Sequence, residues 1–285
     1  MRSRMDEPRL SAREFRVTMS VLFAALRESD EIVLGGQHQA HAEVKVDGSE
    51  VTSADRATER LLRACLRAAW PGDALYGEEY GGKLPARGRC WLVDPIDGTA
   101  SYAIGMPMFG SLLSLIVDGV AVLGCIHLPA LQETTYAAIG HGCWLQRGGG
   151  GSTRVHVAAP RPLSRAKVGM TLVKENPWYR KPGGEEVMRV ARAAGRLRMV
   201  GDCVQYALLC RGVLDAAVDP FMQPWDVAAL VPCVTEAGGV IGDLLGGGET
   251  GRLLECGSIV AASGARLRSE IVQAALGRGK VRAKR

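Results

Sequence analysis

Cys90-Trp-Leu-Val-Asp-Pro-Ile-Asp-Gly-Thr99 is the stretch of this chain that says most about its fold. Its first four residues form an apolar run typical of a buried strand, and we expect that strand to stop at Asp94. Asp97 follows after a proline that stiffens the turn between the two acids. Gly98 lets the backbone approach a ligand closely, and the turn that begins at Thr99 leaves N–H groups free to hold an anion.

Carboxylates beside amides that bind an anion would compete with that anion or repel it. The combination becomes favourable if divalent cations bridge the carboxylates to a phosphate group. Hard oxygen ligands of this kind select Mg²⁺ or a similar ion. This stretch therefore predicts a metal-dependent phosphate site at the end of a buried strand.

Other acidic residues have settings that suggest the same site. Glu78 and Glu79 follow a turn, where adjacent acids repel each other unless a cation binds between them; two exposed surface glutamates are the alternative. Asp226 follows Trp225 and opens a helix, where it could also simply complement the helix dipole. Asp55 lies at the start of another predicted helix.

The hydrophobic pattern predicts helices followed by an antiparallel meander in the first half of the chain. The helices should cover residues 12–33 and 52–70, with a polar loop or mobile hairpin at 37–50. Asp118-Gly119 lies between two apolar runs and predicts a type I′ hairpin, because both central positions of that turn need a positive φ. The predicted strands of the meander are residues 111–117, 120–126, 134–139 and 143–145.

The second half of the chain alternates strands and helices, which favours an α/β layer. Its predicted strands are residues 167–171 and 198–200, and its predicted helices are 185–194, 203–211 and 227–237. Pro232 lies inside the last of these and should kink or restart it. Four consecutive glycines at 148–151 suggest a boundary. We therefore expect an N-terminal α+β half, 1–150, and a C-terminal α/β half, 151–285, that completes the active site.

Three segments together resemble the signature blocks of the inositol monophosphatase family. They are Gly77-Glu-Glu79, Trp91-Leu-Val-Asp-Pro-Ile-Asp-Gly-Thr99 and Trp225-Asp-Val-Ala-Ala229, and they occur in the family's order and spacing. Val51-Thr-Ser-Ala-Asp55 and Glu236-Ala-Gly-Gly239 fit as well. The resemblance implies an α/β (α+β) fold, a layered αβαβα sandwich of the inositol monophosphatase / fructose-1,6-bisphosphatase type, with the site at the junction of the halves. It also implies a homodimer.

The resemblance further implies a role for each site residue. Two or three Mg²⁺ ions per site would be held by Glu78, Asp94, the Ile96 carbonyl, Asp97 and Asp226. Glu79 would lie beside the metals and help to order the attacking water. That water would be oriented and activated by Asp55, Glu78 and Thr99, while the amides of Gly98 and Thr99 would hold the phosphate. Such metal-assisted hydrolysis suits a phosphate monoester, whose unaided reaction is so slow that an enzyme must lower the barrier by about 20 kcal/mol or more.

The resemblance implies that the region before Trp225 selects the alcohol, and here it comprises Val200-Gly-Asp-Cys203 and Asp219-Pro-Phe-Met-Gln-Pro-Trp225. The Gly-Asp pair in the first of these segments, together with Ala228-Ala-Leu-Val-Pro232 after Trp225-Asp226, looks most like the histidinol-phosphate phosphatases of the family. Histidinol phosphate carries an ammonium group, with which Asp202 or Asp219 could pair. Asp202 could instead be the N-cap of the helix at 203–211. We expect hydrolysis of histidinol phosphate to histidinol, with inositol phosphates as the alternative and nucleotide 3′-phosphates or sugar bisphosphates after them.

A binding or regulatory homologue without turnover is the alternative of another class. The complete set of acids argues against it, since a protein without catalysis has no reason to retain their mutual repulsion. The partner we expect is a small-molecule phosphate substrate. A nucleic-acid partner would rest only on the basic residues at 278–285, which we interpret as a solvated end.

Composition narrows the class of protein. With 47% apolar and 23% charged residues, the chain of 285 residues is ordinary for a globular protein, which excludes disordered and collagen-like classes. Eight cysteines include no Cys-x-x-Cys pair, so a zinc ribbon is not expected. The sequence shows neither a secretory signal nor an apolar run of the ~20 residues that a membrane span needs. We therefore expect a cytoplasmic protein with no membrane partner.

Overall fold

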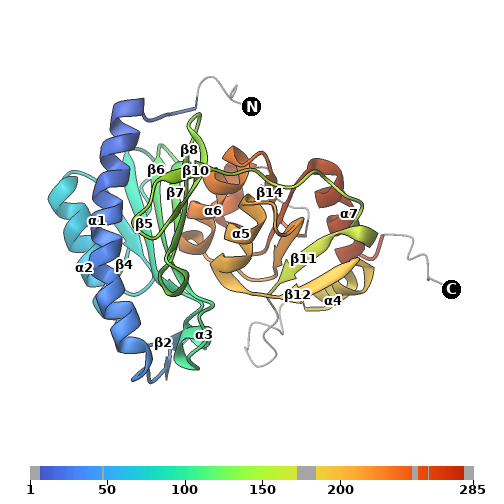
Figure 1. The fold of residues 1–285 in the computed structure, drawn as a ribbon, viewed down its shortest axis with the longest axis horizontal. Coiled ribbons are helices and arrows are strands. Elements are labelled where there is room, and N and C mark those ends of the chain that lie inside the picture. The colour runs from blue at the N-terminus through green and yellow to red at the C-terminus, as the bar shows by residue number, and fades with distance from the viewer. Residues whose placement is uncertain (1–6, 47, 172–183, 246–249, 256, 279–285) are drawn as a thin grey trace.

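The computed structural model describes residues 7–278 apart from 47, 172–183, 246–249 and 256. Its elements stack in five layers that alternate helices and sheets (Figure 1). The outer helices are α1 (Ala12–Gln37) and α2 (Ser53–Ala69) on one side, and α4 (Gly184–Ala193) and α7 (Ala265–Ala275) on the other. Between the two sheets lie α5 (Asp202–Cys210) and α6 (Pro224–Glu236). The αβαβα sandwich implied by the resemblance is therefore confirmed.

The larger sheet has eight strands in the order β10-β9-β8-β7-β6-β5-β3-β4. They are β3 (Ala74–Gly77), β4 (Gly81–Gly82), β5 (Arg89–Asp97), β6 (Gly110–Val117), β7 (Val120–Leu128), β8 (Glu133–Ala138), β9 (Gly142–Arg147) and β10 (Ser152–Arg154). All neighbours pair antiparallel except β3 and β5, which are parallel. The predicted turn between β6 and β7 is confirmed by φ values of 51° at Asp118 and 82° at Gly119.

Two short elements complete the first half beside the large sheet. The hairpin of β1 (Glu43–Val44) and β2 (Glu50–Val51) falls in the segment predicted as a loop or hairpin, and α3 (Thr99–Ala103) follows β5. Strand β10 still pairs with β9, so the first sheet continues past residue 150. The division of the chain into two halves stays a prediction.

The smaller sheet has five strands in the order β12-β11-β13-β15-β14. They are β11 (Lys167–Met170), β12 (Arg196–Met199), β13 (Ala216–Asp219), β14 (Val240–Gly242) and β15 (Ile259–Ala262). Strand β11 is parallel to both of its neighbours, and β15 is antiparallel to both of its own. Short 3₁₀ turns cover Pro129–Leu131, Leu163–Arg165 and Thr250–Glu255.

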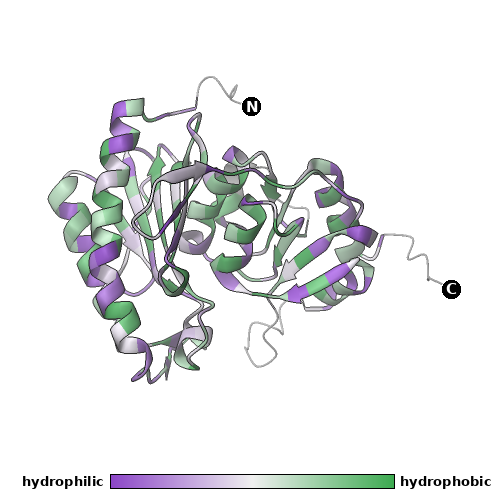
Figure 2. Cartoon of the chain, in the orientation of Figure 1, coloured by the Kyte–Doolittle hydropathy of each residue, from purple (hydrophilic) through white to green (hydrophobic). Residues whose placement is uncertain are grey.

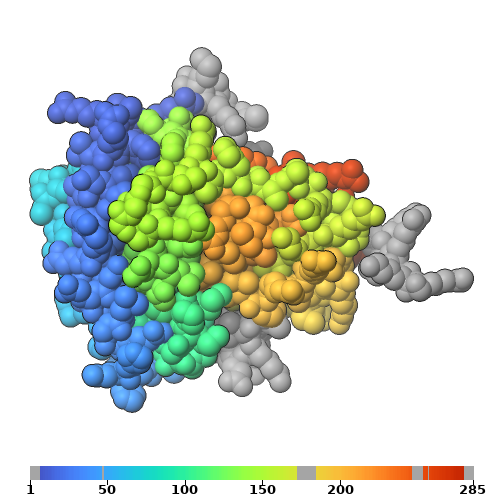
Figure 3. Space-filling model, in the orientation of Figure 1, coloured from blue at the N-terminus to red at the C-terminus, as the bar shows by residue number. Residues whose placement is uncertain are grey.

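The middle helices are apolar on nearly every side because sheets cover both of their faces (Figure 2). Helix α6 packs so closely on β7 that a Cβ added at Gly124 would lie 2.1 Å from the carbonyl oxygen of Ala229. Pro232 does not restart this helix, which runs without interruption from Pro224 to Glu236. In the space-filling view the two halves meet in a continuous surface on the face shown (Figure 3). This packing brings the start of α6 to the ends of β3 and β5.

No helix in the described part of the chain combines the length and the apolar character that a membrane crossing requires.

Candidate active site

The parallel pairing of β3 and β5 places the residues that follow the two strands side by side. Gly77 lies opposite Val93, and the backbone N–H of Glu78 donates to the Val93 carbonyl at 3.1 Å. Glu78 therefore lies next to Asp94. The start of α6 joins them, because the ring of Tyr76 packs edge-on against Trp225 with 5.4 Å between centroids.

An irregularity in β5 brings Asp94 and Asp97 to one side of the strand. Residues three apart on a regular strand point to opposite faces. Here the pairing register with β6 shifts between Asp94 and Asp97, and such a bulge can redirect a side chain. The strand also runs to Asp97 instead of stopping at Asp94 as predicted, since Asp97 still pairs with Gly110.

Three of the predicted metal ligands meet at this point. One carboxylate oxygen each of Asp94, Asp97 and Asp226 lies within 4.8 Å of the other two. The carboxyl group of Asp94 is also within hydrogen-bonding reach of Glu78 and Asp226. Side chains separated by up to 148 residues in the sequence thus form one acidic cluster, Glu78–Asp94–Asp97–Asp226.

Burial and mutual repulsion make the ionised forms of this cluster unfavourable. Burial raises the pKa of Asp94 well above its ordinary value, and the charges of Glu78, Asp97 and Asp226 raise it further. Burial, then Asp226, raises the pKa of Asp97. Burial, with the charge of Glu78, raises the pKa of Asp226 to about 8. A cation among these oxygens would relieve both effects.

The donor set fits a hard divalent cation such as Mg²⁺. Every side chain of the cluster offers oxygen, which is the ligand that Mg²⁺ prefers. Asp94 is only 2% exposed, and its Oδ1 has no hydrogen-bond partner among the described residues. A buried carboxylate oxygen without a partner is costly unless something else satisfies it. The carbonyl of Ile96, another predicted ligand, accepts a hydrogen bond from Thr99 Oγ1 at 2.9 Å.

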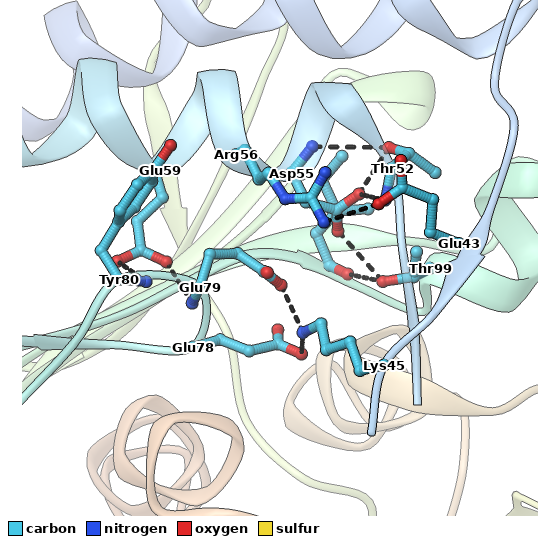
Figure 4. Close-up of polar contacts among 11 residues, drawn as sticks. Glu43, Lys45, Thr52, Asp55, Arg56, Glu59, Glu78, Glu79, Tyr80 and Thr99 are labelled. Carbon is cyan, nitrogen blue, oxygen red and sulfur yellow. Dashed lines mark hydrogen bonds and ion pairs between the residues drawn. The ribbon is translucent and has the colours of Figure 1, made fainter. Parts of the chain in front are cut away.

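Lys45 places a cation between the two adjacent glutamates (Figure 4). Its Nζ, on the turn between β1 and β2, lies 2.8 Å from Glu78 Oε1 and 2.6 Å from Glu79 Oε1. Burial alone would lower the pKa of Lys45, but Glu78 and Glu79 more than offset this and raise it above its ordinary value. Burial raises the pKa of Glu79 to about 7. The two glutamates therefore converge on positive charge and are not independent surface acids.

Asp55 and Thr99 form a hydrogen-bonded pair beside this cluster (Figure 4). Thr99 Oγ1 lies 3.1 Å from Asp55 Oδ1, while Asp55 Oδ2 accepts from the backbone N–H of Thr52 at 2.8 Å and from its hydroxyl at 2.5 Å. Burial raises the pKa of Asp55, although the hydrogen bonds from Thr52 and Thr99 act in the opposite direction. A fully buried carboxylate at the start of α2 is thus aimed at Thr99, the first residue of α3.

Asp202 lies against the loop after β5. A Cβ added at Gly98 would come within 2.9 Å of Asp202 Oδ2, so only glycine allows this approach. Burial, with the charge of Asp97, raises the pKa of Asp202 to about 8. The N-cap alternative for Asp202 is wrong, because Gly201 is the N-cap of α5 and makes no side-chain cap bond. At the start of α5 the backbone N–H of Asp202 donates to Thr171 Oγ1 at 3.2 Å, and the backbone N–H of Cys203 donates to the carboxylate of Asp97.

Asp219, the second predicted contact for a substrate ammonium group, is already satisfied by neighbouring donors. It is 4% exposed and accepts from Thr171 Oγ1 at 2.8 Å and from Gln205 Nε2 at 3.3 Å. Burial, with the charge of Asp202, raises its pKa to about 7. Of the two predicted contacts, Asp202 is the less enclosed.

Several residues of the site were not anticipated from the sequence. They are Lys45, Glu59, Arg63, Thr171 and Gln205. Lys45 lies in a polar segment without periodicity, and Glu59 and Arg63 have the spacing of an ordinary surface pair on a helix. The only signal in the sequence was the nearness of Glu59 to Asp55, which places both acids on one side of α2.

Comparison with known proteins gives a consistent result. The sequence pattern of the inositol monophosphatase family matches residues 16–278 of this chain. A histidinol-phosphatase of Mycobacterium tuberculosis is 35% identical over 249 residues, which are 86% of this chain and 93% of that protein. A probable inositol 1-monophosphatase of the same organism is 33% identical over 219 residues, 73% of this chain and 77% of that one. The solved structure of an IMPase from Thermotoga maritima superposes with a TM-score of 0.78 at 26% identity, covering 92% of this chain and 97% of that one.

Proposed function

This chain belongs to the inositol monophosphatase family, and we propose that within this family it is a Mg²⁺-dependent phosphatase that converts histidinol phosphate to histidinol. Its family and its relatives make it a phosphoric monoester hydrolase. The metal, the substrate and the role of each residue are the proposal. One observation carries the proposal: carboxylate oxygens of Asp94, Asp97 and Asp226 lie within 4.8 Å of one another, and the buried Oδ1 of Asp94 has no hydrogen-bond partner among the described residues.

We assign the metal ligands to the acidic cluster and one backbone carbonyl. Mg²⁺ would be held by Glu78, Asp94, the Ile96 carbonyl, Asp97 and Asp226. When bound, the ions supply positive charge that activates water and offsets charge on the phosphoryl oxygens. Lys45 contributes a further positive charge beside Glu78 and Glu79.

The residues of the chain then orient the water and move its proton. The single proton of the Thr99 hydroxyl is shared between Asp55 Oδ1 at 3.1 Å and the Ile96 carbonyl at 2.9 Å, so its oxygen has lone pairs free to accept a hydrogen bond from the attacking water. Because burial raises the pKa of Asp55, this carboxylate is a stronger base than an exposed aspartate. We assign Glu78 to the same task, Glu79 to ordering the water, and the amides of Gly98 and Thr99 to holding the phosphate.

Asp202 supports histidinol phosphate as the substrate. Its carboxylate lies beside Gly98, next to the proposed phosphate position, and histidinol phosphate is a phosphate monoester with an ammonium group close to it. A charge-assisted hydrogen bond of this kind is worth about 1.5–3 kcal/mol. A histidinol-phosphatase from Mycobacterium tuberculosis is among the relatives. Hydrolysis of inositol phosphates is the second candidate, because a probable inositol 1-monophosphatase is also a relative.

Phosphate release from a panel of substrates tests this proposal. The panel is histidinol phosphate, inositol 1-phosphate and a nucleotide 3′-phosphate, each with Mg²⁺ and with EDTA. We expect Mg²⁺-dependent turnover with the highest kcat/KM for histidinol phosphate. A higher kcat/KM for inositol 1-phosphate would make inositol phosphates, and not histidinol phosphate, the preferred substrates. Turnover that EDTA did not reduce would refute the metal assignment. If no monoester were hydrolysed, a non-catalytic homologue would be favoured.

Asp202→Asn tests the substrate contact separately from catalysis. We expect this variant to lower kcat/KM for histidinol phosphate by about 10–100-fold, in line with the loss of a charged hydrogen bond. Its kcat/KM for inositol 1-phosphate should fall much less, because that substrate carries no ammonium group. Equal losses for both substrates would remove the argument for an ion pair.

The homodimer and the cytoplasmic location stay predictions. Light scattering on the purified protein would test the first of them.

A further inference from the structure

A buried ion pair on α2 holds the loop that presents Glu78 and Glu79. We propose that Glu59 and Arg63 are positioning residues, which fix this loop so that its two glutamates face the metal site. The inference rests on the proposed function, because it assigns a purpose to a pair that never touches the substrate.

Helix α2 directs two carboxylates toward the site from one face. Asp55 and Glu59 are four residues apart, so their side chains project from successive turns. Asp55 accepts from Thr99, whereas Glu59 reaches the loop between β3 and β4 (Figure 4). Each carboxylate therefore serves a different loop of the site.

The Glu59 carboxylate binds the backbone of the loop at the glutamates themselves. Its Oε2 accepts from the N–H of Glu79 at 2.7 Å, and its Oε1 accepts from the N–H of Tyr80 at 3.3 Å. Glu59 is fully buried. Its contact fixes the backbone of Glu79, whose side chain points away from Glu59 toward Lys45 (Figure 4).

Arg63 supplies the opposite charge and holds a carbonyl group on each of the two strands that flank the loop. Its Nη1 lies 3.1 Å from Glu59 Oε1, and its Nη2 donates to the carbonyls of Gly81 in β4 at 2.8 Å and Leu75 in β3 at 3.3 Å. The loop is thus held by its N–H groups through Glu59, and its flanking strands are held through Arg63. Both side chains come from one helix, so the loop is tied to a rigid element.

Gly77 shows how closely this pair approaches the strand before the loop. A Cβ added at Gly77 would lie 2.1 Å from Glu59 Oε1. Only glycine leaves room for the carboxylate beside the backbone at this position. Its φ is not in the left-handed region, so the requirement is for space and not for an unusual backbone conformation.

The two acids on this loop are adjacent and must keep their oxygens close together. Lys45 Nζ lies 2.8 Å from Glu78 Oε1 and 2.6 Å from Glu79 Oε1, but it contacts only their side chains. Glu59 and Arg63 instead hold the backbone of the loop and of its flanking strands. The Glu59–Arg63 pair therefore fixes the positions of Glu78 and Glu79 before a divalent cation binds. Fixing ligands in this way raises metal affinity, and losing such a support typically costs about 10–100-fold in affinity.

Glu59→Gln separates positioning from folding, because it keeps the shape of the side chain but turns one acceptor into a donor that faces a backbone N–H. The probe is Mn²⁺ alone, with binding followed by electron paramagnetic resonance in the absence of substrate. Asp73→Asn is the matched control. Asp73 accepts from Arg89 Nε at 3.0 Å and from Trp91 Nε1 at 3.0 Å, so it ties the start of β3 to β5, at the end of β3 that lies away from the loop.

We expect Glu59→Gln to raise the dissociation constant for Mn²⁺ by about tenfold or more, while Asp73→Asn changes it less than about twofold. Both variants should lower the melting temperature. Excess Mg²⁺ should restore most of the kcat of Glu59→Gln, because the ligands themselves remain. If Glu59→Gln does not fold, Arg63→Lys is measured instead, since it keeps the charge but loses the planar fork.

The inference would be overturned if folded Glu59→Gln bound Mn²⁺ as tightly as the wild type, or if Asp73→Asn weakened Mn²⁺ binding to the same extent. Either result would leave the proposed function intact. Wild-type protein that binds no Mn²⁺ would overturn the proposed function and this inference with it.

Discussion

Replacing Asp94 by asparagine should stabilise the metal-free protein and at the same time abolish its response to Mg²⁺. Asp94 is almost fully buried among three other acids, and the change removes its charge without changing its shape. The amide group of Asn can donate a hydrogen bond to Glu78 or Asp226, where the carboxylate could only repel them when ionised. A repulsive contact thus becomes an attractive one.

The spacing of the oxygens sets the size of this effect. At the 4.8 Å that limits the cluster, two full charges repel by about 3 kcal/mol if the effective dielectric constant is about 20. Burial and the neighbouring acids raise the pKa of Asp94 as well as that of Asp226, which is raised to about 8, so neither carboxyl group is fully ionised near neutral pH and the repulsion is reduced. We therefore expect a gain of about 1–3 kcal/mol in the free energy of unfolding, with a rise in Tm of about 2–4 °C for each kcal/mol.

Thermal unfolding at pH 8 in EDTA, repeated with MgCl₂, measures both parts of the prediction. The wild type should gain Tm with Mg²⁺, since a ligand that binds only the folded state stabilises it. The Asp94→Asn variant should start higher, gain little and show no turnover. Asp118→Asn is the control, because Asp118 is exposed on the β6–β7 turn and its contact to the Gly88 N–H survives the change. If Asp94→Asn lowered Tm in EDTA, or kept the Mg²⁺ response, the reasoning would be refuted.

Three further predictions follow from particular contacts. Gly77→Ala should lower Tm and weaken Mn²⁺ binding, because the added Cβ would lie 2.1 Å from Glu59 Oε1. Gly72→Ala is the control and should leave both Tm and Mn²⁺ binding unchanged, because no atom lies near its added Cβ. Equal effects of the two substitutions would contradict the packing argument. Glu236→Ala should lower the free energy of unfolding by about 1–3 kcal/mol, because the backbone N–H groups of Gly140 and Gly142 lose their acceptor. The kcat should not change, and a fall in kcat would show that Glu236 does more than support the fold. The stability of the metal-free protein should decrease as the pH rises from about 4 to 8. The pKa of Asp226 is about 8 in the folded protein and 3.8 ordinarily, so in this range the folded state binds a proton that the unfolded state has lost. Saturating Mg²⁺ should abolish that decrease. Urea titrations at several pH values measure the effect, and a metal-free stability that rose with pH would show that the acids of the cluster do not repel one another.

Local patterns in the sequence predicted most elements of the first half. Asp118-Gly119 required a turn with two positive φ angles, and that turn is present. The apolar run before Asp94 predicted a buried strand, but not the register shift that turns Asp94 and Asp97 to the same side. A bulge depends on how the neighbouring strand pairs, which no local pattern reveals.

The sequence does not reveal the two residues that hold the β3–β4 loop, because charged side chains are usually exposed and these two are buried. Glu59 and Arg63 have the four-residue spacing of an exposed helix pair, yet both are buried. Charged side chains are rarely buried unless they are paired, so the surface interpretation is the natural one until the fold is known. Asp202 was a reasonable N-cap in the sequence, but its φ of 50° places it outside the conformation of a capping residue.

A crystal structure of the protein soaked with Mn²⁺ tests the central claim most directly. We predict an anomalous scattering peak within coordination distance of the carboxylates of Asp94, Asp97 and Asp226. A saturated crystal whose manganese peaks all lay away from these three residues would contradict the account.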